Sequence, residues 1–166
     1  MYDSVRLDDA HVLGNFDCGN ESLNIWLIDH ARRADAQGIA NVYVWTAPGT
    51  SEVSAYFAIC PTELVRTESG LSGSMSGGHS RIPGYLMARL AIDASLRGRG
   101  YGSQLLLDAL DRVVAASEIG GGRLIVVDAV DDDARRFYEH FHFTPVGKRE
   151  SRLVMKVSTA VQALRG

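Results

Sequence analysis

The sequence predicts a single α+β (mixed α/β) domain over residues 1–166. Apolar runs of strand length alternate with stretches in which apolar residues recur at helical spacing, in the approximate order β-α-β-β-β-α-β-α-β. A glycine-rich stretch at residues 97–103 joins one apolar run to one helical pattern, so a turn suited to phosphate falls at the end of a central strand. The length matches one domain, and neither an internal repeat nor a linker interrupts it.

Composition narrows the class of protein. Hydrophobic residues make up 46% of the chain, which is enough for one core. No apolar run has membrane-spanning length and no secretory signal is visible, so we expect a cytoplasmic protein that does not enter a membrane. Cys18 and Cys60 are expected to be reduced thiols. The net charge of −3 argues against a protein that coats nucleic acid generally. We expect no metal, because even the closest pair, His140 and His142, lacks zinc-site spacing.

The first third of the chain predicts a weak strand over 4–9, a helix and a hairpin. Asp17 or Asn20 can cap the helix, and Gly38 can end it. Its apolar stripe faces the core and consists of Leu23, Trp26, Leu27, Ala31 and Ala34. Residues 39–46 and 52–60 then form the hairpin strands, and Pro61 ends the second strand or marks an irregularity in it.

Residues 66–83 differ from their surroundings, because glycine and serine dominate them. A structureless stretch of this length inside a domain is either functional or disordered, and both readings stay open. A strand over 84–93 follows. The helical pattern after the turn begins at Gln104 and stops at Gly120.

The last part predicts a central strand over 123–129, since its apolar run is nearly continuous. Asp131 or Asp132 can cap a short helix over 134–140. Residues 151–157 alternate as a strand, and residues 158–166 form a short helix or a tail.

The turn at 97–103 predicts a pyrophosphate cradle. Glycines let an anion approach the free amides at a helix N-terminus, and the arginines add positive charge. The dinucleotide-binding fingerprint fails because Ser103 stands where a third glycine is needed, and no Gly-Lys-Ser/Thr of a P-loop occurs. Arg97, Gly100 and Gly102 instead follow Arg-x-x-Gly-x-Gly, which resembles the coenzyme A pyrophosphate loop of the GNAT N-acetyltransferases.

A second pattern strengthens this resemblance. Ala134, Phe137, Tyr138 and Phe143 match a GNAT motif, although His142 replaces its usual glycine and Asp132 replaces an asparagine that often touches the pantetheine arm. Phe16-x-Cys-Gly near the start and Leu86-x-Ala-Arg-Leu-Ala-Ile-Asp93 before the turn resemble the GNAT toxins of type II toxin–antitoxin modules. The resemblance covers nearly the whole chain and is weakest over 61–83.

The resemblance implies a fold, a reaction and partners. The fold would be the GNAT fold, with a central mixed, mostly antiparallel sheet flanked by helices. The protein would use acetyl-CoA to acetylate the α-amino group of aminoacyl-tRNA and so block translation. A ribbon-helix-helix antitoxin would restrain it, and it would form a homodimer.

The resemblance also implies roles for individual residues. Tyr138 would protonate the departing CoA thiolate, which a phenol can do at neutral pH. Acetyl-CoA would be held by Leu90, Ala91, Ile92, Arg97, Gly98, Arg99, Gly100, Tyr101, Gly102, Ser103, Asp132 and Phe137. We expect tRNA phosphates at Arg66, Arg81, Arg89, Lys148 and Arg149.

No general base is obvious, which favours an α-amine acceptor, since its pKa near 8 leaves part of it neutral. Glu63 and His79 are bases in another reading. Two other functions also stay open: a GNAT enzyme acting on a small amine or a protein N-terminus, and a non-catalytic acetyl-CoA sensor or partner-binding module.

Overall fold

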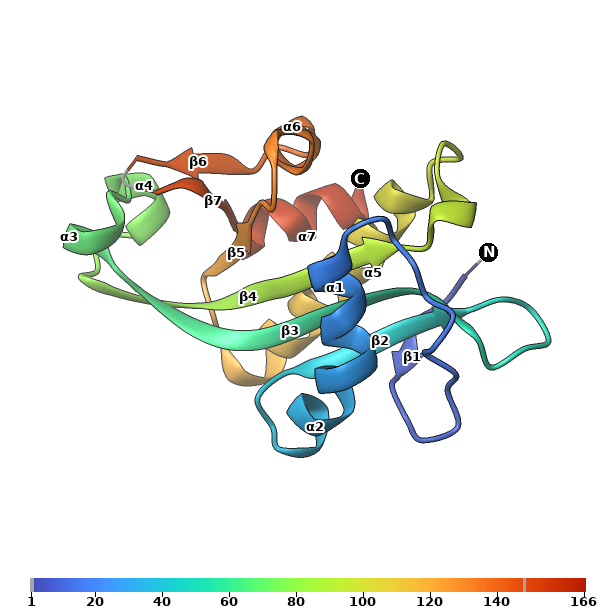
Figure 1. Ribbon diagram of the computed structural model, residues 1–166. Helices are drawn as coiled ribbons and strands as arrows, with labels where there is room; N and C mark the ends of the chain where they lie inside the picture. The colour runs from blue at the N-terminus through green and yellow to red at the C-terminus, as the bar shows by residue number, and fades with distance from the viewer. Residues whose placement is uncertain (1, 148) are drawn as a thin grey trace. The chain divides into compact units, whose positions relative to one another are not determined.

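The computed structural model describes residues 2–147 and 149–166 (Figure 1). Its strands are β1 (Val5–Arg6), β2 (Asn41–Thr46), β3 (Val53–Val65), β4 (Arg81–Ile92), β5 (Leu124–Asp128), β6 (Thr144–Val146) and β7 (Arg149–Lys156). Its α-helices are α1 (Glu21–Ile25), α2 (Ala31–Ala36), α3 (Arg66–Ser69), α4 (Gly73–Ser76), α5 (Tyr101–Gly120), α6 (Asp132–His140) and α7 (Val157–Arg165). A π-helix, η1 (Trp26–His30), joins α1 to α2, and a 3-10 turn, η2 (Ala94–Leu96), follows β4.

The strands lie in the order β1-β2-β3-β4-β5-β7-β6. The β4–β5 pair is parallel, whereas the β1–β2, β2–β3, β5–β7 and β6–β7 pairs are antiparallel. The predicted α+β fold with a mixed, mostly antiparallel sheet and flanking helices is therefore confirmed.

Residue contacts group the chain into two compact units. The first contains the chain up to Cys60 together with Ala88–Ala109. In it, the continuous helical segment α1–η1–α2 packs on β2 and β3 (Figure 1). Leu27 and Ala31, both fully buried, meet Val42, Val44 and Tyr56 of these strands. The predicted apolar stripe thus faces a core.

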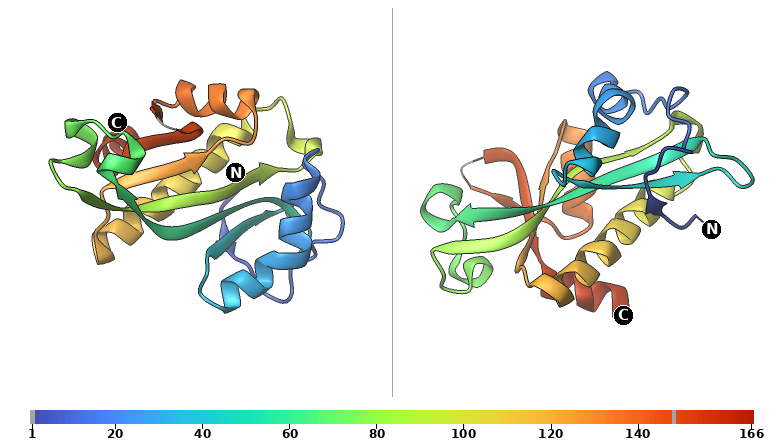
Figure 2. Two further views of the ribbon diagram at one scale, coloured as in Figure 1. Left: turned by 60° about the vertical axis from the view of Figure 1, so that its left-hand side comes forward. Right: turned by 90° about the horizontal axis from the view of Figure 1, so that it is seen from below.

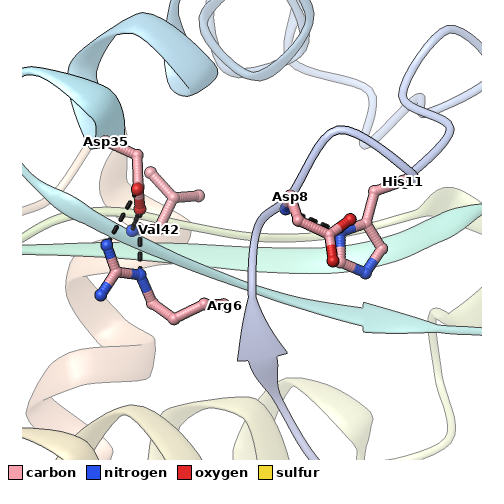
Figure 3. A network of polar contacts seen from close by, with 5 residues as sticks. All are labelled: Arg6, Asp8, His11, Asp35 and Val42. Atoms are coloured by element: carbon pink, nitrogen blue, oxygen red, sulfur yellow. Dashed lines mark hydrogen bonds and ion pairs between the residues drawn. The ribbon is translucent and has the colours of Figure 1, made fainter.

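Local polar contacts hold this helical segment in place. Asn20 caps α1 by accepting a hydrogen bond from the Leu23 amide, so Asn20 and not Asp17 is the cap. At the other end, Asp35 accepts hydrogen bonds from the Arg6 guanidinium at 2.8 and 3.1 Å and from the Val42 amide at 2.9 Å (Figure 3). One carboxylate therefore joins α2 to both β1 and β2.

The second unit contains Pro61–Met87 and Leu110–Gly166. Leu124 and Val126 of β5 are completely buried in its core, as expected for a central strand. Figure 2 shows the end of β3 leading into α3 and α4 and returning as β4. The glycine- and serine-rich stretch is therefore folded, and its last residues belong to β4.

The Arg123 side chain holds the glycine- and serine-rich stretch in place through hydrogen bonds. Arg123 donates hydrogen bonds to the carbonyls of Met75 and Ser74 at 2.9 and 3.0 Å, which satisfies acceptors near the end of α4. Gly77 has a φ of +63°, and a Cβ there would lie 2.8 Å from the Arg123 guanidinium carbon. Lys156 adds a contact to the Ser74 hydroxyl at 2.7 Å.

Other boundaries differ from the expected ones. Pro61 does not end β3, because β2 begins at Asn41, opposite Ile59, and needs no amide from Pro61. Helix α5 begins at Tyr101 rather than Gln104, and α6 begins at Asp132. Strand β6 was not expected. Residues 157–165 form helix α7, so the end of the chain is a short helix and not a tail.

Candidate active site

Strand β4 leads directly into the predicted cradle. It pairs with β5 from Gly84 to Met87, so Leu90 and Ile92 lie beyond the last residue of that ladder. Ala91 is buried in the core of the first unit, whereas Leu90 and Ile92 are half-buried. Because strand residues alternate between faces, Leu90 and Ile92 share the face opposite Ala91. The three residues expected near the thioester thus remain outside the parallel ladder.

The turn that follows requires its glycines. Gly98 and Gly100 have φ values of +76° and +79°, a conformation that costs a residue with a Cβ about 1–2 kcal/mol. A Cβ built on either would meet nothing within 4 Å. The glycines are needed for their backbone conformation, and the surface above them is open to a ligand.

The amides of the cradle belong to the start of α5. Its first described bond runs from the Gln104 amide to the Gly100 carbonyl at 3.4 Å. The amides of Tyr101, Gly102 and Ser103 therefore lie in the first turn, where a helix provides no carbonyl partners. Together with the helix dipole they attract an anion. Arg99 is exposed beside them and donates to the Ser95 carbonyl at 3.0 Å.

Arg97 contacts a neighbouring loop. Its guanidinium donates a hydrogen bond to the Cys18 carbonyl, and a Cβ on Gly19, which has a φ of +85°, would collide with it. The Arg97 side chain thus braces the turn against the loop before α1. A contact between this side chain and pyrophosphate stays a prediction.

The Asp93 carboxylate and the backbone of Asp17 complete this brace. Asp93 accepts hydrogen bonds from the Asp17 and Ser95 amides, both at 3.0 Å, while the Asp17 carbonyl accepts the Ala94 amide at 2.9 Å. Burial tends to raise the pKa of Asp93, but these amide hydrogen bonds and the Ser95 hydroxyl hold it below its usual value. The Asp93 carboxylate therefore stays charged at neutral pH and holds the turn.

Asp108 joins α5 to β2 and to the N-terminal segment within the first unit. It accepts the Trp45 indole N–H at 2.8 Å, the Ser4 hydroxyl at 2.7 Å and the Ser4 amide at 3.1 Å. Sequence reasoning missed this residue. The only signal was one carboxylate within the apolar pattern of a helix, which ordinarily reads as surface.

The predicted acid, Tyr138, lies in the second unit on α6. Its side chain is 7% exposed, and its ring meets Phe137 and Phe143 edge-on at 5.4 and 5.5 Å. No described residue accepts a hydrogen bond from its hydroxyl, yet no fully enclosed polar atom lacks a partner in the described part of the chain. The hydroxyl therefore reaches solvent. Burial raises the pKa of Tyr138 above its ordinary value, so the phenol stays protonated.

A Schellman motif positions Tyr138. The Phe143 amide donates to the Tyr138 carbonyl at 3.1 Å and the His142 amide to the Glu139 carbonyl at 3.0 Å. His142 has a φ of +70°, the only such value for a non-glycine residue in the described ranges. The position where the GNAT pattern has glycine is thus one where the backbone is left-handed.

The other predicted residues of α6 lie near its two ends. Asp131 is the cap, accepting the Ala134 amide at 2.8 Å, whereas Asp132 is the exposed first residue of the helix. Asp131, Asp132 and Arg135 line an open pocket of about 210 Å³. Phe137 is half-buried and stands edge-on to Phe141 at 5.1 Å. Of the adjacent aromatic residues Phe137 and Tyr138, Tyr138 is therefore the buried one.

The predicted bases have other surroundings. Glu63 pairs with Arg81 at 2.8 Å, with both side chains more than half exposed, and it lines an open pocket of about 320 Å³. His79 is exposed, and its amide donates to the Ser76 carbonyl at 3.1 Å. Neither arrangement marks a general base.

The predicted tRNA contacts fall in both units. Arg66 and Arg81 belong to the second unit and Arg89 to the first. Arg66 is half-buried, and its guanidinium lies 3.6 Å from where a Cβ on Gly73 would stand. Arg149 begins β7, and Lys148 lies outside the described residues.

Residues 2–147 and 149–166 contain neither a membrane-spanning helix nor a metal-binding cluster. No helix there has the length and apolar character to cross a membrane. Nor do three or more His, Cys, Asp or Glu side chains gather in that part of the chain so that they could hold a metal ion.

Comparison with known proteins bears on this site. The family model described as acetyltransferase (GNAT) domain matches residues 63–145. The tRNA-acetylating toxin of Mycobacterium tuberculosis is 33% identical over 160 residues, covering 94% of this chain and 93% of the relative. AtaT complexed with acetyl-methionyl-tRNAfMet superposes with a TM-score of 0.89 at 28% identity, covering 100% of both chains. A tyrosine-to-phenylalanine variant of AtaT, bound to acetyl-CoA and the C-terminus of the antitoxin AtaR, gives 0.86 at 28% identity over 99% of both chains.

Proposed function

The chain belongs to the GNAT family of acetyl-CoA-dependent N-acetyltransferases, and we propose that its acceptor is the α-amino group of aminoacyl-tRNA. The observation that carries this proposal is the full-length likeness to AtaT, whose structure holds acetyl-methionyl-tRNAfMet. A protein that acetylates this amine in the cell would block translation and act as a toxin.

The cradle fits the pyrophosphate of acetyl-CoA. Open space lies above Gly98 and Gly100, and the amides of Tyr101 to Ser103 have no carbonyl partners within the helix. We assign the pyrophosphate to the amides of residues 98–103, with Arg99 adding charge at the exposed edge. Amides of residues 90–92 would hold the pantetheine arm and polarise the thioester carbonyl.

Acetyl-CoA supplies an activated acetyl group. The neutral amine attacks the thioester carbonyl carbon, an N–C bond forms and the C–S bond breaks. Tyr138 donates its hydroxyl proton to the departing thiolate and later regains a proton from solvent. Its raised pKa keeps this proton available at neutral pH, and its hydroxyl is not engaged by any described residue. We propose that Asp132, the first residue of this helix, and Phe137, which directly precedes Tyr138, also contact the cofactor.

The amine itself needs little help from a base. An α-amino group has a pKa near 8, so a useful fraction is neutral at pH 7, whereas a lysine amine is almost fully charged. The ion pair of Glu63 and the exposure of His79 fit a mechanism in which water takes the proton of the amine.

Partners follow from the same likeness. We propose restraint by a ribbon-helix-helix antitoxin, assembly as a homodimer, and action in the cytoplasm, where aminoacyl-tRNA is found. The structures of the AtaT variant bound to the C-terminus of the antitoxin AtaR support a protein inhibitor. Arg66, Arg81, Lys148 and Arg149 remain proposed contacts for tRNA phosphates.

The test is to incubate the full-length protein with radiolabelled acetyl-CoA and total charged tRNA, with uncharged tRNA as the control. We expect the label on aminoacyl groups, recovered as N-acetyl amino acids after mild ester hydrolysis, and none on uncharged tRNA. Label on polyamines or on peptide N-termini, but not on charged tRNA, would refute the proposed acceptor and leave the GNAT assignment intact.

A further inference from the structure

Arg89 occupies an unusual position in the first unit. It is half-buried on β4, and its guanidinium lies over the Trp26 ring at 5.1 Å from the ring centroid. The Trp26 ring also stacks on the Tyr56 ring, at 6.0 Å between ring centroids and 11° between ring planes. The hydroxyl of Tyr56 donates to the Leu23 carbonyl at 2.7 Å. A rigid aromatic surface, anchored to α1, thus supports the guanidinium.

The charge of Arg89 has no carboxylate partner in the described part of the chain. Its one hydrogen bond there goes to the adjacent Ala88 carbonyl, at 2.9 Å. Burial raises the pKa of the Cys60 thiol, and the positive charge of Arg89 opposes that rise, as it does at Tyr56. Leaving a half-buried cation without a counter-ion costs free energy, which an arriving anion would recover.

Arg89 is also close to the reacting segment. It directly precedes Leu90–Ile92 on the same strand, and successive strand residues are about 3.3 Å apart. It shares a face of β4 with Ala91, which packs in the core cluster that contains Trp26. An anion bound by Arg89 would therefore lie beside the strand expected to hold the thioester.

Resting on the proposed function, we propose that Arg89, held against Trp26, binds a phosphodiester of the 3′-terminal nucleotides of the acceptor. The flat guanidinium offers paired N–H donors that match two phosphate oxygens, and its cation–π contact with Trp26 restricts its position in advance. The bound phosphate would hold the attached aminoacyl group beside residues 90–92. Arg89 is then a determinant that distinguishes a nucleotide-borne amine from a free one.

Two small acceptors isolate the phosphate. One is an aminoacyl-adenosine, which has no phosphate, and the other is an aminoacylated CpCpA trinucleotide carrying the same amino acid, chosen from those the wild type acetylates on charged tRNA. The wild type should prefer the trinucleotide in kcat/KM by about 10- to 100-fold, the range expected for a hydrogen-bonded charge. The Arg89→Gln variant should lose this preference, mainly through the trinucleotide.

The controls separate this effect from misfolding. Arg33→Gln removes an exposed arginine of α2 in the same unit and should leave the preference unchanged. Arg89→Lys keeps a point charge without the planar fork and should retain part of it. Thermal unfolding and acetyl-CoA affinity of Arg89→Gln should match the wild type.

The outcomes distinguish two failures. If the wild type acetylates neither acceptor nor charged tRNA, the proposed function fails and Arg89 has no nucleotide to bind. If charged tRNA is acetylated but Arg89→Gln lowers kcat/KM equally for both small acceptors, the phosphate role of Arg89 is wrong and the function stands. An Arg89→Gln variant that keeps the full wild-type preference for the trinucleotide would also overturn the proposal.

Discussion

Tyr138 combines a fixed ring with an unengaged hydroxyl. The ring is buried between Phe137 and Phe143, and the Schellman motif ties the Tyr138 carbonyl to the Phe143 amide. A tyrosine that served only the core would pack in the same way, so the ring contacts do not reveal a role. The hydroxyl does, because it contributes no hydrogen bond to any described residue.

Removing that hydroxyl should therefore affect chemistry and not folding. We expect Tyr138→Phe to lower kcat by about 10²- to 10⁴-fold, the usual contribution of a general acid. The free energy of unfolding should change by less than about 0.5 kcal/mol, since no bond within the protein is lost. Steady-state acetylation kinetics and urea unfolding measure the two effects. A variant with wild-type kcat would refute the acid role.

The backbone of His142 adopts a strained conformation. It is left-handed at the position where the GNAT pattern has glycine, and non-glycine residues pay about 1–2 kcal/mol there. Glycine gains more entropy in the unfolded chain, which offsets part of the relief. We expect His142→Gly to stabilise the protein by about 0.5–1 kcal/mol in urea unfolding.

His140 provides the matched comparison for this substitution. It ends α6 with helical geometry, so His140→Gly should lose stability by about 1 kcal/mol. If His142→Gly is destabilising as well, the His142 side chain contributes contacts that outweigh the strain of its backbone.

At the scale of elements, the strand–turn–helix from β4 to α5 is braced along its length. Asp93 and Arg97 tie the turn to the loop before α1, and Asp108 ties α5 to Trp45 and Ser4. None of these contacts uses the amides expected to bind pyrophosphate. The brace leaves the amides free and holds them in the conformation that binding requires.

The glycines of this turn make that preorganisation measurable. An alanine at Gly98 would be strained by about 1–2 kcal/mol in the left-handed conformation. If the turn of the free protein relaxes to avoid this strain, it must return to the strained conformation when it binds acetyl-CoA. We expect Gly98→Ala to weaken acetyl-CoA binding by about 5- to 30-fold in calorimetry. Gly14→Ala is the control, because its Cβ meets nothing and its φ is not left-handed. Binding within twofold of the wild type would place the pyrophosphate elsewhere.

The elements show which parts of the fold a sequence can predict. Caps were predictable because an N-cap acts within three residues, as Asn20 and Asp131 do. The order of the glycine stretch, by contrast, depends on Arg123, which lies about fifty residues away in the chain. The serine and glycine content of that stretch indicates only that its backbone is flexible. No sequence pattern near Arg123 indicates that its side chain hydrogen-bonds to the stretch.

The same division holds for the site. Roles for the cradle and for Tyr138 could be proposed from the sequence because each is a short pattern with its own chemistry, and both roles stay predictions. The structure shows left-handed backbone at Gly98 and Gly100 of the cradle. The contacts of Asp108 and the position of the Arg89 guanidinium over the Trp26 ring could not be predicted, since both join residues more than sixty positions apart. Arg97 was assigned to a ligand by its motif, yet its observed contact is the Cys18 carbonyl.

At the scale of the whole molecule, the proposed reaction makes a prediction about pH. Below a pKa near 8 the acceptor is an ammonium that cannot attack, so kcat/KM should rise with pH through about 8. Tyr138 must be protonated to act, and burial raises its pKa, so the protonated form persists above the ordinary value near 10. We therefore expect a rise to a plateau between pH 6 and 9.5, with no falling limb.

Initial rates of acetyl transfer to charged tRNA across this range check the profile, with the stability of the ester followed in parallel. Tyr138→Phe should keep the rising limb, which belongs to the amine, while its plateau is lower. A limb that falls below pH 9 in the wild type and is absent from Tyr138→Phe would show that the phenol ionises too easily for its buried position. A limb that falls in both proteins would assign the acid to another residue.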